Sequence, residues 1–258
     1  MKTIKLIVGL FLIFTAFTFT SCDNEPIDSS IELNNGNNNG GGNNGGGNNG
    51  GGGTSTGDYW PAALNNQWVF KLDGAQQPPM KIISINSIGG STYYTFDTLF
   101  GQGSMGTVGS ATTRMKKNSG DYYIKIEDLN LNLGNNLTAT MTGFEYVILK
   151  DYLAVGQTWN GVYTQTTNYS DPQIPDITQT TNYTGTIVEK GATVTVNGAS
   201  YTNVIKLRIS QSTTFPGLPT PTVADSDYWF AKDVGPIKAV TVSQGSTTTN
   251  ELMSFILN

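Results

Sequence analysis

Apolar and polar residues alternate with a period of two through most of the chain after residue 57. In Gln67–Leu72 this alternation places Trp68, Phe70 and Leu72 on one face. Such a pattern is typical of strands with one buried face, whereas an amphipathic helix would repeat every three to four residues. We find no helical periodicity longer than one turn in this region. The pattern therefore predicts a domain built from strands.

Turn signals divide the alternating segments into hairpins. Gly89-Gly90 separates the predicted strands Lys81–Ile88 and Ser91–Phe100, and a two-glycine connection is a hairpin signal. Asn197-Gly198 is a favoured pair for a type I′ turn. If these two residues form the turn, Val196 faces Ala199, and the same face continues to three apolar residues, Ile205, Leu207 and Ile209. Turn position and hydrophobic pattern thus give the same register.

Two threonine-rich segments, Tyr163–Tyr183 and Thr241–Thr249, suit exposed or edge strands. With these strands included, Asp58–Asn258 has 201 residues, enough for one well-buried core. We predict a single all-β domain over residues 58–258. Its architecture would be one large antiparallel curved sheet, half-barrel or sandwich-like, with under about 15% helix against the usual third.

The first residues have the layout of an export signal. Lys2 and Lys5 precede Leu6–Phe19, an uncharged and mainly apolar run that is short for a membrane-spanning helix. Phe19-Thr20-Ser21-Cys22 resembles a bacterial lipobox, whose cysteine is lipidated and becomes the mature N-terminus. We therefore interpret residues 1–21 as a lipoprotein signal peptide and Cys22 as the lipidation site. The alternative is an ordinary cleaved signal followed by a free Cys22.

Residues 22–57 are interpreted as the lipidated cysteine and a flexible tether. Asn34–Gly53 contains only Asn and Gly, so it offers no apolar side chain to offset the cost of ordering the chain. From Cys22 onward there are 12 basic side chains (14 minus Lys2 and Lys5) against 19 acidic ones, a net charge of −7. Anionic lipid would repel such a chain, so the lipid on Cys22 would have to hold it to the membrane.

The amino-acid composition excludes several kinds of catalytic and metal site. The chain has no His and one Cys, which excludes His-containing zinc sites, Ser–His–Asp triads and disulfides within the chain. The acidic balance, with an isoelectric point near 4.7, argues against nucleic acid as a partner. We expect no cofactor, no metal, and a monomer.

Three segments carry a resemblance: Tyr59–Phe70, Leu153–Trp159 and Tyr228–Lys238. Together they resemble a group of Bacteroidota lipoproteins that are largely uncharacterised and whose domain is similar to the LolA-like β half-barrel. This resemblance implies a curved sheet around an apolar concavity and supplies no catalytic residues. Asp23 and Glu25 resemble the acidic signal that sends many such lipoproteins to the outer face of the outer membrane. The expected location is the outer membrane, lipid-anchored and exposed on the cell surface, or alternatively on its periplasmic face.

Motifs that suggest catalysis or ion binding have simpler interpretations. Gly101–Gly106 matches G-x-G-x-x-G but is not followed by a helix-forming segment. Asp128–Gly134 resembles a calcium loop, yet its leucines alternate as in a strand. The carboxylate pairs Asp171/Asp176 and Asp225/Asp227 lie in turn-like sequence. Asp97-Thr98-Leu99 resembles a Bacteroidota O-glycosylation acceptor within a predicted strand. We expect no catalytic residues and no enzyme activity.

The four tryptophans could form core or contact a ligand. Trp68 and Trp159 enter strands and are predicted to be core. Trp60, beside Pro61, and Trp229 are predicted to be the more exposed pair. We take Trp60, Trp229 and Met105, the last in the glycine-rich segment 101–109, as candidate ligand-binding residues.

Two hypotheses for function follow. The first is a non-catalytic binding module that holds an apolar or lipidic ligand in its concave face. The second is a surface lipoprotein that binds glycans or another protein. A continuous apolar lining of the concave face would favour the first. Aromatic side chains with amide neighbours would favour the second.

Overall fold

A computed structural model of the protein describes residues 53–99 and 109–258, and the strands in these residues form one antiparallel sheet. The strands are β1 (Gln67–Leu72), β2 (Ala75–Gln76), β3 (Met80–Ile88), β4 (Ser91–Phe96), β5 (Gly109–Ser110), β6 (Thr113–Asn118), β7 (Asp121–Ile126), β8 (Leu129–Gly134), β9 (Leu137–Met141), β10 (Phe144–Lys150), β11 (Thr158–Tyr169), β12 (Ile177–Val196), β13 (Ala199–Thr214), β14 (Thr222–Ala231), β15 (Gly235–Ser243) and β16 (Ser246–Ile256).

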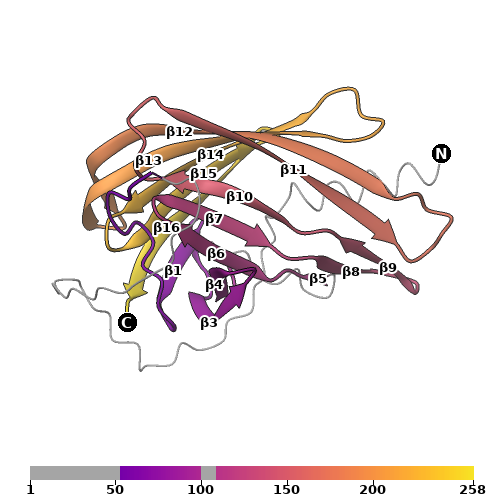
Figure 1. The fold of residues 1–258 in the computed structure, drawn as a ribbon, viewed down its shortest axis with the longest axis horizontal. Coiled ribbons are helices and arrows are strands. Elements are labelled where there is room, and N and C mark those ends of the chain that lie inside the picture. Colours follow the sequence, from indigo (N-terminus) through magenta and orange to yellow (C-terminus); the bar gives the residue numbers. More distant parts are fainter. Residues whose placement is uncertain (1–52, 100–108) are drawn as a thin grey trace.

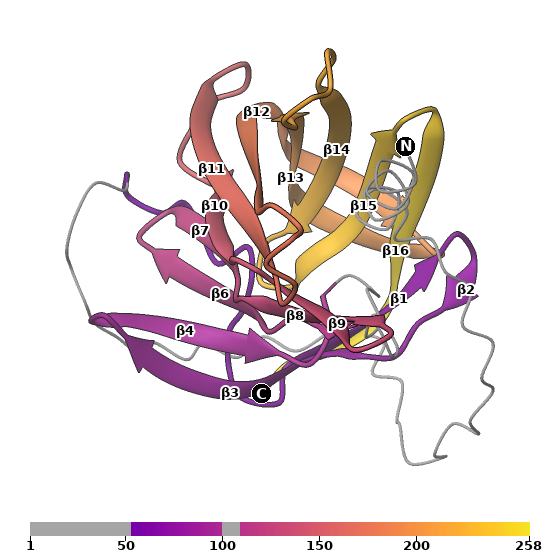
Figure 2. The same cartoon turned by 90° about the vertical axis from the view of Figure 1, so that its right-hand side faces the viewer.

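The order of strands across the sheet is β10-β7-β6-β4-β3-β1-β16-β15-β14-β13-β12-β11-β9-β8-β5, and β2 pairs with β1. β1 therefore pairs with β16, and the register places Gln67 opposite Ile256. The sheet is strongly curved: β11 to β16 form one side, and β3, β4, β6 and β7 lie across from them (Figures 1 and 2). It is not closed, because β10 and β5 at its two ends do not pair.

This architecture confirms the predicted fold class. The described residues contain strands, turns and bends but no α-helix. In the part of the chain that the structure describes, no helix is long and apolar enough to cross a membrane.

The predicted turns are correct. Asn197 and Gly198 have φ values of 47° and 82°, as a type I′ turn requires, and Val196 pairs with Ala199. The predicted inner face of β13 is buried as well: Ile205, Leu207 and Ile209 are at most 2% exposed. Asn203 also has a positive φ of 53°, which locally disturbs the alternation.

Three local predictions need correction. Val204 is fully buried beside Ile205, so β13 does not alternate strictly. The strand predicted to reach Phe100 ends at Phe96, and Asp97 and Thr98 form a bend. The third correction concerns the threonine-rich strands, predicted as exposed or edge strands: they carry exposed residues, but they are not edges, because β12 lies between β11 and β13, and β15 between β14 and β16. Threonine suits them because one face is solvated, even though both strand edges are paired.

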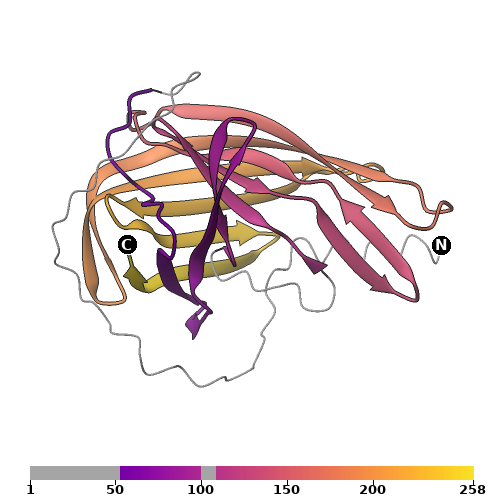
Figure 3. The same cartoon turned by 60° about the horizontal axis from the view of Figure 1, so that its bottom comes forward.

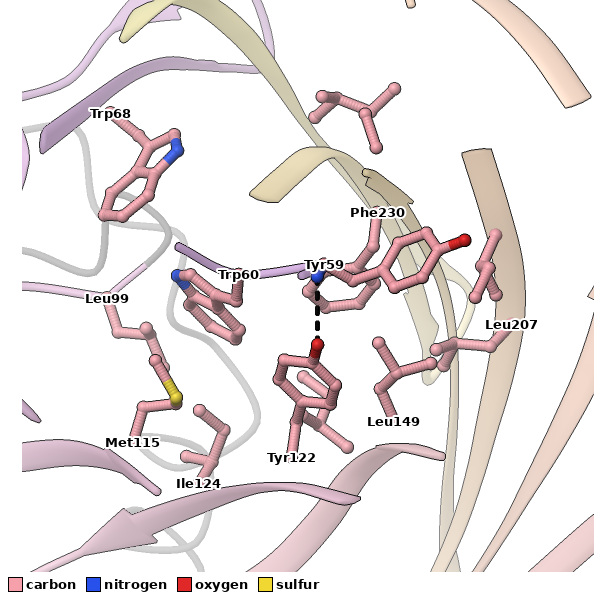
Figure 4. Packing of buried hydrophobic residues seen from close by; sticks show 14 of the residues in the cluster. Tyr59, Trp60, Trp68, Leu99, Met115, Tyr122, Ile124, Leu149, Leu207 and Phe230 are labelled. Carbon is pink, nitrogen blue, oxygen red and sulfur yellow. Dashed lines mark hydrogen bonds between the residues drawn. The ribbon is translucent and has the colours of Figure 1, made fainter. Parts of the chain in front are cut away.

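Large aromatic side chains fill one end of the space inside the curved sheet (Figure 4). Trp60 and Trp68 are fully buried. The Trp60 ring lies 5.7 Å from that of Phe96 and 5.5 Å from that of Phe230, which places it between the two sides of the sheet. The indole N–H of Trp68 donates to the Val234 carbonyl at 2.7 Å. Because no helix covers this face in the described residues, these side chains form its core.

The segment before β1 is fastened to the domain as it enters the core. The Tyr59 amide donates to the Tyr122 hydroxyl at 2.9 Å (Figure 4), and Asp58 forms an ion pair with Lys117 at 3.0 Å. Residues 53–57, which composition alone places in the tether, also contact the domain: the Gly120 amide donates to the Gly53 carbonyl at 3.2 Å. This entry point lies at the end of the molecule opposite the β8–β9 and β11–β12 hairpin tips (Figures 1 and 3).

Where β10 meets the opposite side of the sheet, contacts of the Val147 backbone with the side chains of Trp159 and Tyr183 replace strand pairing. We call this contact the seam. β10 pairs with β7 along one edge, and its other edge lies near β11 without a ladder. There, Val147 uses side chains as partners: its amide donates to the Tyr183 hydroxyl at 3.1 Å, and its carbonyl accepts from the Trp159 indole N–H at 3.0 Å. These two bonds satisfy backbone groups that an edge strand would otherwise leave open.

Glycines make room for the two seam side chains. The Trp159 ring lies over Gly185 and the Tyr183 ring over Gly161, so closely that a Cβ on either glycine would collide with the ring. Gly161 pairs with Tyr183, and Trp159 pairs with Gly185, in the β11–β12 ladder. Each aromatic thus covers the glycine directly opposite it.

We predict that Gly185→Ala lowers the free energy of unfolding by about 2–3 kcal/mol, because the new methyl group displaces Trp159 from the seam. Urea unfolding measures this change. Thr186→Ala on the opposite face of β12 is the matched control and should cost under about 1 kcal/mol. Equal effects of the two substitutions would contradict the role given to the glycine.

Candidate functional site

An aromatic layer crosses the inner face beyond the main core. It contains Phe144 and Tyr146 from β10, Tyr163 from β11, Tyr183 from β12 and Tyr228 from β14. Phe144 stacks on Tyr163, with ring centroids 4.2 Å apart and planes at 11°, and Tyr146 meets Tyr183 edge-on at 5.8 Å. The layer therefore joins β10 to the opposite side of the sheet through ring contacts.

Three tyrosines of this layer, Tyr146, Tyr163 and Tyr228, stay protonated at neutral pH. Burial raises the pKa of Tyr163 to about 12 and raises the pKa of Tyr146 well above its usual value. Burial also raises the pKa of Tyr228. Each of these three phenols therefore retains its proton and can act as both hydrogen-bond donor and acceptor.

Uncharged polar side chains occupy the inner face beyond the aromatic layer. Gln165 lies two residues after Tyr163, and Gln211 two residues after Ile209, so both continue the face of the core. These side chains bond to one another or to the layer. The pairs are Gln211 Nε2 to Tyr163 Oη at 2.9 Å, Gln179 Nε2 to Gln165 Oε1 at 2.8 Å, Thr181 with Thr213 at 2.9 Å, and Ser226 with Thr241 at 2.8 Å.

This polar surface continues to β16 at Asn250. Asn250 lies opposite Ala239 in the ladder and two residues before the core residue Leu252, so it shares their inner face. Its Oδ1 is buried and has no hydrogen-bond partner. A buried acceptor without a partner is uncommon in proteins. Within the described residues, Asn250 Oδ1 is therefore an unsatisfied acceptor on the inner face.

The prediction that Trp60 is exposed is wrong. It is fully buried, because the chain turns inward at this point and places the ring between Phe96 and Phe230. The ring therefore offers no surface to a ligand. Trp68 and Trp159 confirm their predicted core positions, at 0% and 6% exposure.

Trp229 is half-buried on the opposite face of β14 from Tyr228 and Phe230. The ammonium groups of Lys206 and Lys238 lie 4.8 and 5.8 Å from its ring centroid, one from each neighbouring strand. The structure does not bring Trp229 together with the aromatic layer. Its surroundings fit a cation–π contact on the outer face of the sheet.

Two predicted site residues, Cys22 and Met105, lie outside the described residues, as does Gly101–Gly106. In the segment Asp128–Gly134, residues Leu129–Gly134 form strand β8, as the alternation of leucines predicts. Within residues 53–99 and 109–258, no cluster of three or more carboxylate or sulfur ligands could hold a metal ion.

The carboxylate pairs have ordinary structural roles. Asp171 accepts a hydrogen bond from the Gln173 amide at 2.9 Å, as its turn-like sequence predicts. Asp227 lies within β14 and not in a turn, which corrects the prediction for that pair. Burial would raise the pKa of Asp227, but its bonds to Arg208 and Lys206 outweigh burial and lower the pKa. This carboxylate is committed to ion pairs on the outer face.

Sequence reasoning missed the inner-face residues because their segments are rich in Thr and Gln on both faces. A usable signal exists in two pairs of residues: Tyr163 and Gln165, like Thr181 and Tyr183, are two positions apart, which places aromatic and polar side chains on one face. The partners of these residues lie on strands distant in the sequence, so their convergence requires the sheet order.

No known family profile matches the chain, and no curated protein matches it. Among solved structures, it is similar to a candidate lipoprotein from Parabacteroides distasonis, with a TM-score of 0.49 and 11% identity over 78% of this chain and 99% of the other. It is also similar to a candidate exported protein with a YmcC-like fold from Bacteroides fragilis, with a TM-score of 0.45 and 10% identity over the same shares of the two chains.

The raised pKa of Tyr163 predicts a loss of stability in alkali. The unfolded phenol ionises near pH 10, whereas the folded one ionises near 12. The stabilisation from the neutral buried phenol is therefore complete below pH 10 and is lost as the pH rises toward 12. Urea unfolding at pH 8 and pH 11 should show a smaller loss for Tyr163→Phe than for the parent. An equal loss would contradict this assignment.

Proposed function

We propose that this protein is a lipoprotein anchored in the outer membrane through Cys22 and exposed at the cell surface. Its domain would bind a neutral, hydroxyl-rich ligand of the oligosaccharide class on the inner face of the sheet. The domain acts by binding, without catalysis, as a monomer and without nucleic acid as a partner.

The observation that supports this ligand class is the chemistry of the inner face beyond the aromatic layer. Gln165, Gln179, Gln211, Thr181, Thr213, Ser226, Thr241 and Asn250 present amides and hydroxyls, and none carries a charge. Sugars offer many hydroxyl donors and acceptors and have apolar faces that pack on aromatic rings. An uncharged lining favours a neutral ligand, because an ionised one would be desolvated without a counter-charge.

A second candidate is an amphiphile with an acyl chain, the ligand class that the sequence favours. The observation for it is a separate small apolar cluster on β8 and β9, formed by Leu129, Leu131, Ala139 and Met141. Leu133 from β8 and Tyr169 from β11 pack against it. The apolar part of the inner face next to β1 is different, because the aromatic core fills it.

The ligand test compares binding with stability at Asn250. We expect micromolar binding of a neutral oligosaccharide, about −8 kcal/mol, detected by native mass spectrometry across neutral sugars, acidic sugars and fatty acids. Asn250→Leu should weaken this binding about tenfold, because it removes the acceptor. Its free energy of unfolding should stay the same or rise, since an unpaired buried acceptor is also removed.

Asn182→Leu, on the outer face of β12, is the control and should leave binding unchanged. Binding of fatty acids but not sugars would favour the acyl-chain candidate. If none of these ligands binds, both candidate functions are contradicted.

The anchor has its own test. Replacing Cys22 with Ser should move the protein from the membrane to the soluble fraction, because the acyl chains that hold it would be absent. Fractionation followed by immunoblotting measures this shift. Ser30→Ala, in the same segment, should remain with the membrane. A Cys22→Ser protein that still sediments with membranes would show that the lipid is not the anchor.

A further inference from the structure

Asp151 joins three parts of the molecule at the end of β10. Its carboxylate accepts from the Ser55 hydroxyl at 2.6 Å and from the Thr56 amide at 3.1 Å. Its carbonyl accepts from the Thr56 hydroxyl at 3.0 Å and from the Lys190 ammonium group on β12 at 2.6 Å. Asp151 is fully buried. The entering segment, the end of β10 and β12 therefore meet at one residue.

Two residues, Gly57 and Asp58, separate this junction from the attachment of the chain to the core. Ser55 and Thr56 bond Asp151, whereas Tyr59 bonds Tyr122 and Trp60 packs within the aromatic core. Tyr122 links the two attachments, because its hydroxyl accepts from the Tyr59 amide at 2.9 Å and donates to the Gly57 carbonyl at 3.1 Å. Release of Gly53–Gly57 would break the bond from Tyr122 to Gly57 as well as the bonds to Asp151, whereas the Trp60 ring is held by Phe96 and Phe230 and can remain in place.

The strand that ends at this junction is also the weakly held edge of the sheet. Val147, four residues before Asp151, is bonded across the seam only by the side chains of Tyr183 and Trp159 in the described residues. The same strand supplies Phe144 and Tyr146 to the aromatic layer. The end of β10 therefore lies next to both the seam and one side of the candidate site.

We propose that Gly53–Gly57 is a latch: docked on Asp151, it keeps the end of β10 against β12, and a pull on the chain before Gly53 releases it and loosens the seam. The consequence for ligand affinity rests on the proposed function, since the aromatic layer borders that site. The consequence for the seam does not.

The direction of the effect follows from the kinds of contact along the entering chain. A load on the chain before Gly53 first reaches the bond from the Gly120 amide to the Gly53 carbonyl and then the hydrogen bonds at Asp151, which two exposed residues make. It reaches the buried rings of Tyr59 and Trp60 only afterwards. Hydrogen bonds near solvent can exchange for bonds to water, whereas withdrawing buried rings exposes apolar surface. The latch is therefore the first contact to yield.

The test uses the full-length protein with the double substitution Ser55→Ala and Thr56→Val, which removes both latch hydroxyls and leaves the core attachment intact. Hydrogen exchange followed by NMR should show the Val147 amide exchanging at least tenfold faster than in the parent. The amides of Ile124 and Leu207, in the core strands β7 and β13, should be unchanged. Thr54→Ala, at an exposed neighbouring residue, is the control and should alter none of them.

Asp151→Asn supplies a second variant, because an amide group presents an N–H to one of the two latch donors and can accept from only one of them. It should accelerate Val147 exchange in the same way. Unchanged Val147 exchange in a variant whose Thr56 amide has lost its protection would overturn the latch. If the parent binds a neutral oligosaccharide, the double variant should bind it about fivefold more weakly. Absence of sugar binding by the parent would count against the proposed function alone, since Val147 exchange tests the latch without ligand.

Discussion

The structure depends on one constraint: because residues 53–99 and 109–258 contain no α-helix, the curved sheet they form must cover its inner face with its own side chains. Trp60, Trp68 and Phe230 meet this constraint at one end, where they pack between the two sides of the sheet. The aromatic layer at Tyr146 and Tyr163 continues the cover. Beyond that layer the inner face changes from rings to amides and hydroxyls. The position of this change places the candidate site.

The seam shows how the same constraint acts on the backbone. Curvature brings β10 close to β11 and β12 without the alignment that a ladder needs. Trp159 and Tyr183 therefore supply the donor and acceptor that a neighbouring strand would have supplied to Val147. Both side chains lie flat only because Gly161 and Gly185 have no Cβ. Two aromatic residues and the two glycines opposite them therefore pack the seam and satisfy the backbone of β10 where the curved sheet lacks a ladder.

Local signals in the sequence were sufficient for the strands and their turns. Alternation located β1, and Asn197-Gly198 gave both the turn and the register of the longest hairpin. The boundary at Phe96 and the disturbance at Asn203 could not be read in this way, because bends and bulges have weak sequence signatures. The central position of the threonine-rich strands was also missed. Propensity reports how a side chain fits a solvated face, and both edge and central strands can have one.

The candidate site was less predictable than the fold. The sequence pointed to tryptophans as ligand contacts, but a large ring beside Pro61 can turn inward as readily as outward, and Trp60 does so. The residues that now define the site come from β10 to β16, and each is unremarkable within its own strand. Their shared face exists only after the strands are placed in order. Long-range pairing of this kind leaves no signal at any single position.

The pairing of β1 with β16 has a consequence for the order of events in folding. The β12–β13 hairpin brings together residues that are neighbours in the chain, so it can form early and at little entropic cost. β1 is the first of these strands to be synthesised, yet β16, which pairs with one of its edges, is the last. Until β16 appears, Trp68 and Phe70 lie on a strand with an open edge. Such an intermediate would require protection from association with other chains, and the sheet matures only when its earliest and latest segments meet.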